Sequence, residues 1–181
     1  MRIVIDKLAV LNPFAKLPDE ETAARAARAG AVGAWLAAVS SAFGAAMIFL
    51  KLDVYVDEMR RQVQATAAMQ DPAMAEAMMA NAAPSIVWTT IGFSGLVGLV
   101  YVLLGVVQWR RKTRLIPLLL LLFAIYGLAV SLLAIVGHKA SNPYSSLGQL
   151  SVGLVLSIAT LLCFIAGTRG GFRLHALKKA G

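Results

Sequence analysis

The sequence lacks several of the features on which soluble domains are built. A single cysteine, Cys163, excludes an internal disulfide and any metal cluster made from several cysteines. Only 14% of the 181 residues are charged and 59% are hydrophobic, whereas a soluble domain has about 25% charged and about 45–50% apolar residues. This composition excludes a water-soluble globule and a disordered chain.

Charge is absent altogether from four long stretches. None of them contains Asp, Glu, Lys, Arg or His, and they cover residues 31–50, 85–107, 115–136 and 150–168. A helix needs about 20 apolar residues to cross a hydrocarbon core about 30 Å thick, and the stretches lack the alternation that is typical of strands. Because every backbone N–H and C=O must be paired inside a bilayer, we predict an all-α integral membrane protein with four transmembrane helices over these residues.

The links between the predicted spans indicate how they pack. Only seven residues, 108–114, separate the second span from the third, and the link to the fourth is also short, so we expect consecutive spans to be antiparallel neighbours. The prediction is a compact antiparallel bundle of four helices over residues 31–168. A cytoplasmic N-terminal segment, 1–30, precedes it, and a basic tail, 169–181, follows it.

The N-terminal segment does not resemble a secretory signal, because it is long and contains four acids. Hydrophobic residues at helical spacing near its start fit either a short helix on the membrane surface or a partly ordered tail. Pro18 and the three acids that follow it predict the start of a helix, in which Glu21 and Arg25 are spaced to pair. We expect this helix to run directly into the first span.

Basic residues are distributed unevenly about the predicted spans. Thirteen of the 17 Lys and Arg residues lie in segments 1–30, 108–114 and 169–181, and the other four lie in 51–84 and 137–149. Because short loops rich in Lys and Arg stay cytoplasmic, we predict that both termini are cytoplasmic. The net charge of +8 then indicates topology and contact with anionic lipid headgroups, and we expect no nucleic-acid partner. The abundance of Ala, Leu and Arg suggests a bacterial inner membrane.

Small residues recur every fourth position along the first span. Helices in a membrane associate through close packing, which small side chains permit. We therefore predict a helix-packing or partner face made of Gly33, Ala37, Ser41 and Ala45. The spacing can also arise by chance in a segment rich in alanine. The partners predicted are the lipid bilayer and either another membrane protein or a second copy of the chain.

The parts needed for catalysis are missing from the sequence. No ionisable residue lies inside a predicted span, which argues against a proton or ion path. The two histidines, His138 and His175, are predicted on opposite sides of the membrane, so they cannot hold a haem together. No phosphate-binding or dinucleotide-binding motif is present. We expect no enzymatic activity, no cofactor and no catalytic residue.

The loop 51–84 is the largest predicted segment outside the membrane. Asp71 and Pro72 are typical of an N-cap and a first helical residue, and we expect that second helix to end near Asn81 and Pro84, which gives an extracytoplasmic helical hairpin. Five of the seven methionines lie here. Thioether sulfur suits Cu(I), so candidate ligands are Met69, Met74, Met78 and Met79. The same side chains suit an adaptable apolar surface or ordinary hairpin packing.

Polar side chains gather in the half of the spans that is predicted to be outermost. They are Thr89, Thr90, Ser94, Ser131, Gln149 and Ser151. These groups fit either a shallow polar vestibule or hydrogen bonds to backbone carbonyls within and between helices. The sequence therefore favours a non-enzymatic accessory, assembly or regulatory subunit that acts through helix–helix contacts. The alternative is a small transport, lipid-binding or solute-binding protein that uses the vestibule.

Overall fold

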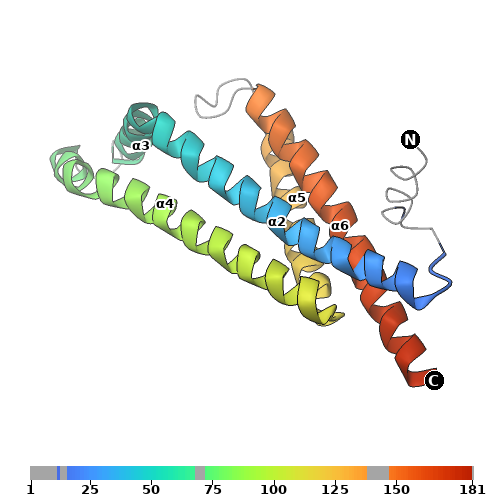
Figure 1. The fold of residues 1–181 in the computed structure, drawn as a ribbon. Helices are drawn as coiled ribbons and strands as arrows, with labels where there is room; N and C mark the ends of the chain where they lie inside the picture. Colours follow the sequence, from blue (N-terminus) through green and yellow to red (C-terminus); the bar gives the residue numbers. More distant parts are fainter. Residues whose placement is uncertain (1–11, 13–15, 68–71, 138–146, 181) are drawn as a thin grey trace.

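The computed structural model describes residues 12, 16–67, 72–137 and 147–180, and every regular element within them is a helix. The elements are α2 (Glu20–Leu50), α3 (Leu52–Ala67), α4 (Pro72–Arg111), α5 (Leu115–Gly137) and α6 (Leu147–Ala180) (Figure 1). The all-α prediction is confirmed for this part of the chain. The surface helix or tail expected near the start of the sequence lies outside the described residues.

Within the described residues, three helices are long and apolar enough to cross a membrane. They are Glu20–Leu50, Ser85–Arg111 and Ser151–Lys179, and a shorter apolar helix, Leu115–Val130, accompanies them. Helices of this length and composition, several to a chain, characterise a multi-pass helical membrane protein.

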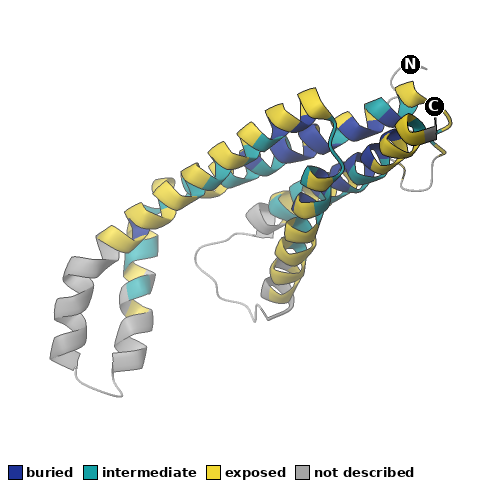
Figure 2. Cartoon of the chain, turned by 90° about the horizontal axis from the view of Figure 1, so that it is seen from below, coloured by how far each residue is buried: buried dark blue, intermediate teal, exposed yellow. Residues whose placement is uncertain are grey.

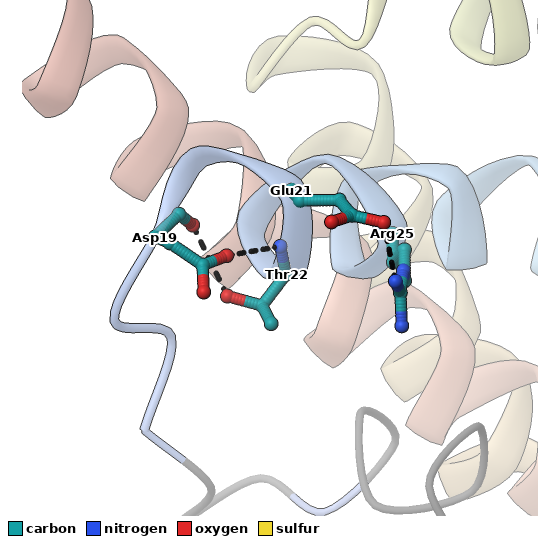
Figure 3. Close-up of polar contacts among 4 residues, drawn as sticks. All are labelled: Asp19, Glu21, Thr22 and Arg25. Atoms are coloured by element: carbon teal, nitrogen blue, oxygen red, sulfur yellow. Dashed lines mark hydrogen bonds and ion pairs between the residues drawn. The ribbon is translucent and has the colours of Figure 1, made fainter. Parts of the chain in front are cut away.

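The start of α2 is a well-satisfied helix terminus. Asp19 is its N-cap, and the Asp19 carboxylate accepts a hydrogen bond of 2.7 Å from the Thr22 backbone N–H (Figure 3). The Thr22 hydroxyl donates to the Asp19 carbonyl oxygen at 3.1 Å, and Glu21 pairs with Arg25 one turn along. The predicted helix start and ion pair are confirmed, and α2 continues without a break to Leu50.

One helix end predicted from the sequence was wrong, and another helix extends past the predicted span. The helix of the hairpin does not end near Pro84 but continues as α4 to Arg111. Proline removes one N–H donor, a loss that long membrane helices absorb through neighbouring groups. The tail expected after residue 168 is helical to Ala180, because Leu174 is buried against Ala23 and Ala27 at the start of α2.

The packing order of the helices also differs from the expected bundle. The helix α2 is central and packs against both α6 and α4, while α5 packs against α6 and α3 against α4, which completes a helical hairpin. The expectation that the second and third spans are neighbours was wrong, because α4 and α5 meet at only a few residues. The short connection fixes only the adjoining ends of α4 and α5, whereas the small residues of α2 let two helices approach it along their length.

The result is a wedge rather than a compact bundle. The helices α2 and α5 begin, and α4 and α6 finish, at one end of the molecule, which we call the basic end because Arg110, Arg111 and Lys178 lie there; the other end is the hairpin end. Buried residues concentrate toward the basic end, and the pairs α2/α4 and α5/α6 diverge away from it (Figure 2). Packing therefore holds the molecule together at one end.

The helices α2 and α6 cross almost backbone to backbone at the basic end. A Cβ atom on Gly170 would lie 2.2 Å from the Ala27 backbone nitrogen, and one on Gly167 would lie 2.5 Å from the Gly30 Cα. The buried Pro117 closes this crossing, since a Cβ on Gly30 would lie 3.0 Å from the Pro117 Cβ. Pro117 lies in the first turn of α5, where its missing N–H removes no intrahelical bond. Only glycine fits at Gly167 and Gly170 with this helix separation.

Gly170→Ala is expected to push α2 and α6 apart and to destabilise the fold by about 1–3 kcal/mol, the usual range for overpacking. The matched control is Gly153→Ala on the same helix, where an added Cβ meets nothing within 4 Å. The control should be neutral or gain up to about 1 kcal/mol of helix propensity. Thermal unfolding in detergent, followed by circular dichroism, measures both. Equal unfolding temperatures for the two variants would contradict the close crossing.

The cap of α2 also predicts a dependence of stability on pH. The hydrogen bonds from the Thr22 backbone and side chain lower the pKa of Asp19 below its ordinary value. A lowered pKa means that the carboxylate stabilises the fold above the unfolded pKa, about 3.9, and that this contribution is lost as the pH falls through the folded pKa. Asp19→Asn keeps an acceptor for the cap but does not titrate. The wild type should therefore unfold at a higher temperature than Asp19→Asn at pH 7, with a smaller difference at pH 3; a difference independent of pH would refute this.

Candidate functional site

The helices α2 and α4 pack together and form one wall of the wedge. The Ser41 hydroxyl donates a 3.0 Å hydrogen bond to the Ser94 carbonyl oxygen. Nearer the basic end, Gly105 leaves room for Trp35, whose ring centroid lies 5.5 Å from that of Trp109. The Arg28 guanidinium lies 5.5 Å from the Trp109 ring centroid, a cation–π geometry. The seam is thus held by a hydrogen bond and by stacked aromatic rings.

A buried amide joins this wall to the start of α5. The Gln108 side chain is fully buried, and its amide nitrogen donates at 3.0 Å to the carbonyl oxygens of both Ala27 and Thr113. The Thr113 hydroxyl donates to the Gln108 amide oxygen at 2.9 Å. Lys112 adopts a left-handed conformation, with φ of 49°, and its N–H binds the Gln108 carbonyl at 2.9 Å. These bonds set where the chain turns from α4 into α5.

The two walls of the wedge, α2/α4 and α5/α6, separate beyond a small apolar core. Phe164, Ala34 and Leu120 are buried together where the walls meet. Toward the hairpin end of this core lies a cavity of about 260 Å³, to which all four long helices contribute. We call it the wedge cavity, and it is lined by Ala37, Ser40, Ser41, Tyr101, Phe123, Ala124, Gly127, Leu128, Ser157, Thr160 and Phe164.

The wedge cavity combines small side chains with hydroxyl groups. Hydroxyls come from α2, α4 and α6, with Thr160 on α6 buried to 6% exposure. A Cβ on Gly127 of α5 would meet nothing within 4 Å, so this side of the cavity is open. No carboxylate, histidine or lysine lines it, and its chemistry is therefore close packing and hydrogen bonding.

The predicted packing face on the first span is divided among several neighbours. Gly33 faces α6, where an added Cβ would lie 2.9 Å from the Cys163 Cβ and from the Phe164 ring. Ala37 lines the wedge cavity, Ser41 binds α4, and Ala45 is half-buried. Gly33 and Ser41 are thus engaged within the chain.

The structure does not bring the predicted vestibule residues together in a described cavity. Thr89 and Thr90 donate to the carbonyl oxygens of Ser85 and Ile86, four residues earlier in α4, at 2.7 and 2.9 Å. Such bonds are what the backbone-bonding interpretation expects. Ser94 contributes its carbonyl to Ser41, and Ser151 is exposed on α6. The side chains of Ser131 and Gln149 are not described.

The copper hypothesis stays a prediction. Met69 lies outside the described residues. Met74, Met78 and Met79 lie on α4, and their side chains are not described.

Sequence reasoning missed the larger part of two cavities. Of the wedge cavity it singled out Ala37 and Ser41 but not Ser40, Tyr101 or Thr160, although Ser157 and Thr160 are spaced to share one face of a helix. It also missed a second cavity, of about 300 Å³, at the basic end, because it ended the last span at residue 168. The glycines at 170 and 171 and the leucines at 174 and 177 continue the helical pattern and could have revealed it.

Comparison of the chain with protein-family models, with curated proteins and with solved structures found no match. The functional argument therefore depends on the geometry alone.

Proposed function

We propose that the chain is a non-enzymatic accessory or assembly subunit of a membrane complex, and that it receives a transmembrane helix of a partner protein between its two walls. The observation that carries this proposal is the wedge cavity, which is open, lined by small residues and reached by all four long helices. In a membrane, helices associate where small residues allow close approach and hydroxyls can bond across the contact. Both conditions meet in this cavity.

The open surroundings of Gly127 on α5 support a helix as the occupant. Gly167 and Gly170 lie against α2 where it crosses α6. By contrast, a Cβ added to Gly127 would meet no atom within 4 Å. On the same helix, Phe123 and Tyr126 are more than half exposed. An incoming helix would cover this face of α5.

The second candidate is a lipid or small-solute protein. The supporting observation is that the hydroxyls of Ser40, Ser157 and Thr160 line one cavity. Its volume of about 260 Å³ falls just below the range of about 300–1,000 Å³ that is usual for ligand pockets.

The proposal includes a topology of four spans in a bacterial inner membrane, with the basic end in the cytoplasm. The 23-residue α5 is about 34 Å long at 1.5 Å per residue, which is enough to span the hydrocarbon core. Most Lys and Arg residues lie at the basic end or in the segments that adjoin it, as short cytoplasmic segments require.

Labelling with a membrane-impermeant maleimide tests this topology in a Cys163→Ser background. In intact cells or spheroplasts, Arg61→Cys on α3 should react and Lys179→Cys on α6 should not. Both should react to the same extent after permeabilisation, which controls for local accessibility. Reaction of Lys179→Cys before permeabilisation would overturn the orientation.

Photo-crosslinking in native membranes tests the partner helix. A photoreactive amino acid in place of Ser157 should give one discrete protein adduct, whereas the same group in place of Gly95, an exposed α4 position with no neighbour within 4 Å of an added Cβ, should give mainly lipid adducts. Gly127→Leu should reduce the Ser157 adduct at least about fivefold, about 1 kcal/mol in the contact, without lowering the unfolding temperature. Lipid adducts alone at Ser157 would favour the second candidate.

A further inference from the structure

A strongly basic cavity lies at the basic end, on the far side of the α2–α6 crossing from the wedge. Its volume is about 300 Å³, and its walls come from the start of α2, the end of α4, the turn into α5 and the end of α6. The positive side chains that line it are Arg110, Arg111, Lys112, Arg114 and Lys178, and His175 and Glu20 line it as well. Five cations thus face one space with a single carboxylate.

These cations have no counter-ion within the part of the chain that the structure describes. Glu20 forms no ion pair with any of them. Other arginines of the basic end are engaged: Arg169 donates to the Asn12 carbonyl at 2.8 Å, and Arg173 donates to the Leu17 carbonyl at 3.1 Å. Positive charges gathered without partners repel one another unless an anion lies between them. The charge of the cavity lining therefore suits an anionic ligand.

The scaffold holds the cavity in a definite shape. Gly171 lets α6 approach the turn, since an added Cβ would lie 2.8 Å from the Arg114 Cα and 3.0 Å from the Thr113 carbonyl oxygen. The Arg114 guanidinium lies 5.5 Å from the Phe172 ring centroid. Together with the bonds of Gln108, these contacts fix the turn that presents Lys112 and Arg114.

Helix dipoles account for only some of this charge. Arg110, Arg111 and Lys178 lie in the last turns of α4 and α6, where cations stabilise the helix ends. Lys112 and Arg114 lie in the turn before α5, and α5 presents the positive end of its dipole at the same place. A positive charge at Arg114, just before α5, opposes the dipole of that helix, and Lys112, which directly follows α4, adds to the repulsion in the cavity. An anionic ligand is the arrangement that satisfies both groups.

We propose that this cavity binds the phosphate group of an anionic phospholipid. The cavity lies where the apolar parts of α4 and α6 give way to charge, so it is at the depth of the headgroups. Ala24 and Leu174 form an apolar part of its lining, which suits the glycerol backbone beneath a phosphate. Basic pockets between helix ends are suited to such headgroups. A guanidinium group can form two parallel hydrogen bonds to two oxygens of one phosphate.

The test is native mass spectrometry of the full chain in detergent, after removal of lipid and titration with phosphatidylglycerol. The pocket variant is Arg111→Gln with Lys178→Gln, and the matched control is Arg61→Gln with Lys179→Gln, which removes the same charges outside the cavity. The affinity of the pocket variant should fall roughly thirtyfold if each residue contributes about 1 kcal/mol. The control should stay within about twofold of the wild type, and all three should unfold at similar temperatures.

Two further titrations distinguish the source of the phosphate. Phosphatidylcholine, which has no net charge, should bind to the wild type more weakly than phosphatidylglycerol does. The pocket variant should bind the two lipids with equal affinity. Inorganic phosphate should not compete at equal concentration. Equal losses in the pocket and control variants, or equal affinity for the two lipids, would overturn the site. Competition by inorganic phosphate at the same concentration would overturn the lipid as its source.

Discussion

The crossing of α2 and α6 is the constraint on which the other contacts depend. Because Gly167 and Gly170 carry no side chain, the α6 backbone reaches that of α2 at Ala27 and Gly30. That separation buries Leu174 against the start of α2 and allows Pro117 to pack into the crossing. It also brings the turn into α5 against Gly171. Two helices within a lipid bilayer gain little from burying apolar surface against each other, so close backbone packing is the source of their stability.

The same crossing explains why the opposite end is open. Two helices that meet at one point and diverge must leave space elsewhere, and here that space is the wedge cavity between the walls α2/α4 and α5/α6. Within the α2/α4 wall, contacts continue toward the hairpin end, where the Phe49 and Trp88 ring centroids lie 6.2 Å apart. The buried contacts between the two walls lie toward the basic end. The walls therefore share one junction.

The sequence predicts the helices well and their packing poorly, for physical reasons. Stretches without charge identify membrane helices because a bilayer excludes unpaired charge, and the acids after Pro18 mark the start of α2 because a cap needs acceptors. Pro84 was misleading, since proline usually ends helices in water, and the last predicted span stopped at residue 168 because Arg169 interrupts the stretch without charge. The neighbours of α2 could not be predicted, because a row of small residues does not say which helix it meets. The two cavities form as a result of that packing, and they were not predicted for the same reason.

Charge and packing act at the same end of this molecule, and that coincidence bears on function. The Gln108 amide lies between them: it is buried, its hydrogen-bonding groups are satisfied, and it ties α4 to α2 and to the turn beside the basic cavity. A buried amide with all its bonds made favours one arrangement over others, since any shift leaves a polar group unpaired. The hydrogen bonds of Gln108 thus hold the helices at the basic end in one arrangement. The exposed apolar faces of α4 and α5, which in water would associate, are left to lipid or to a partner.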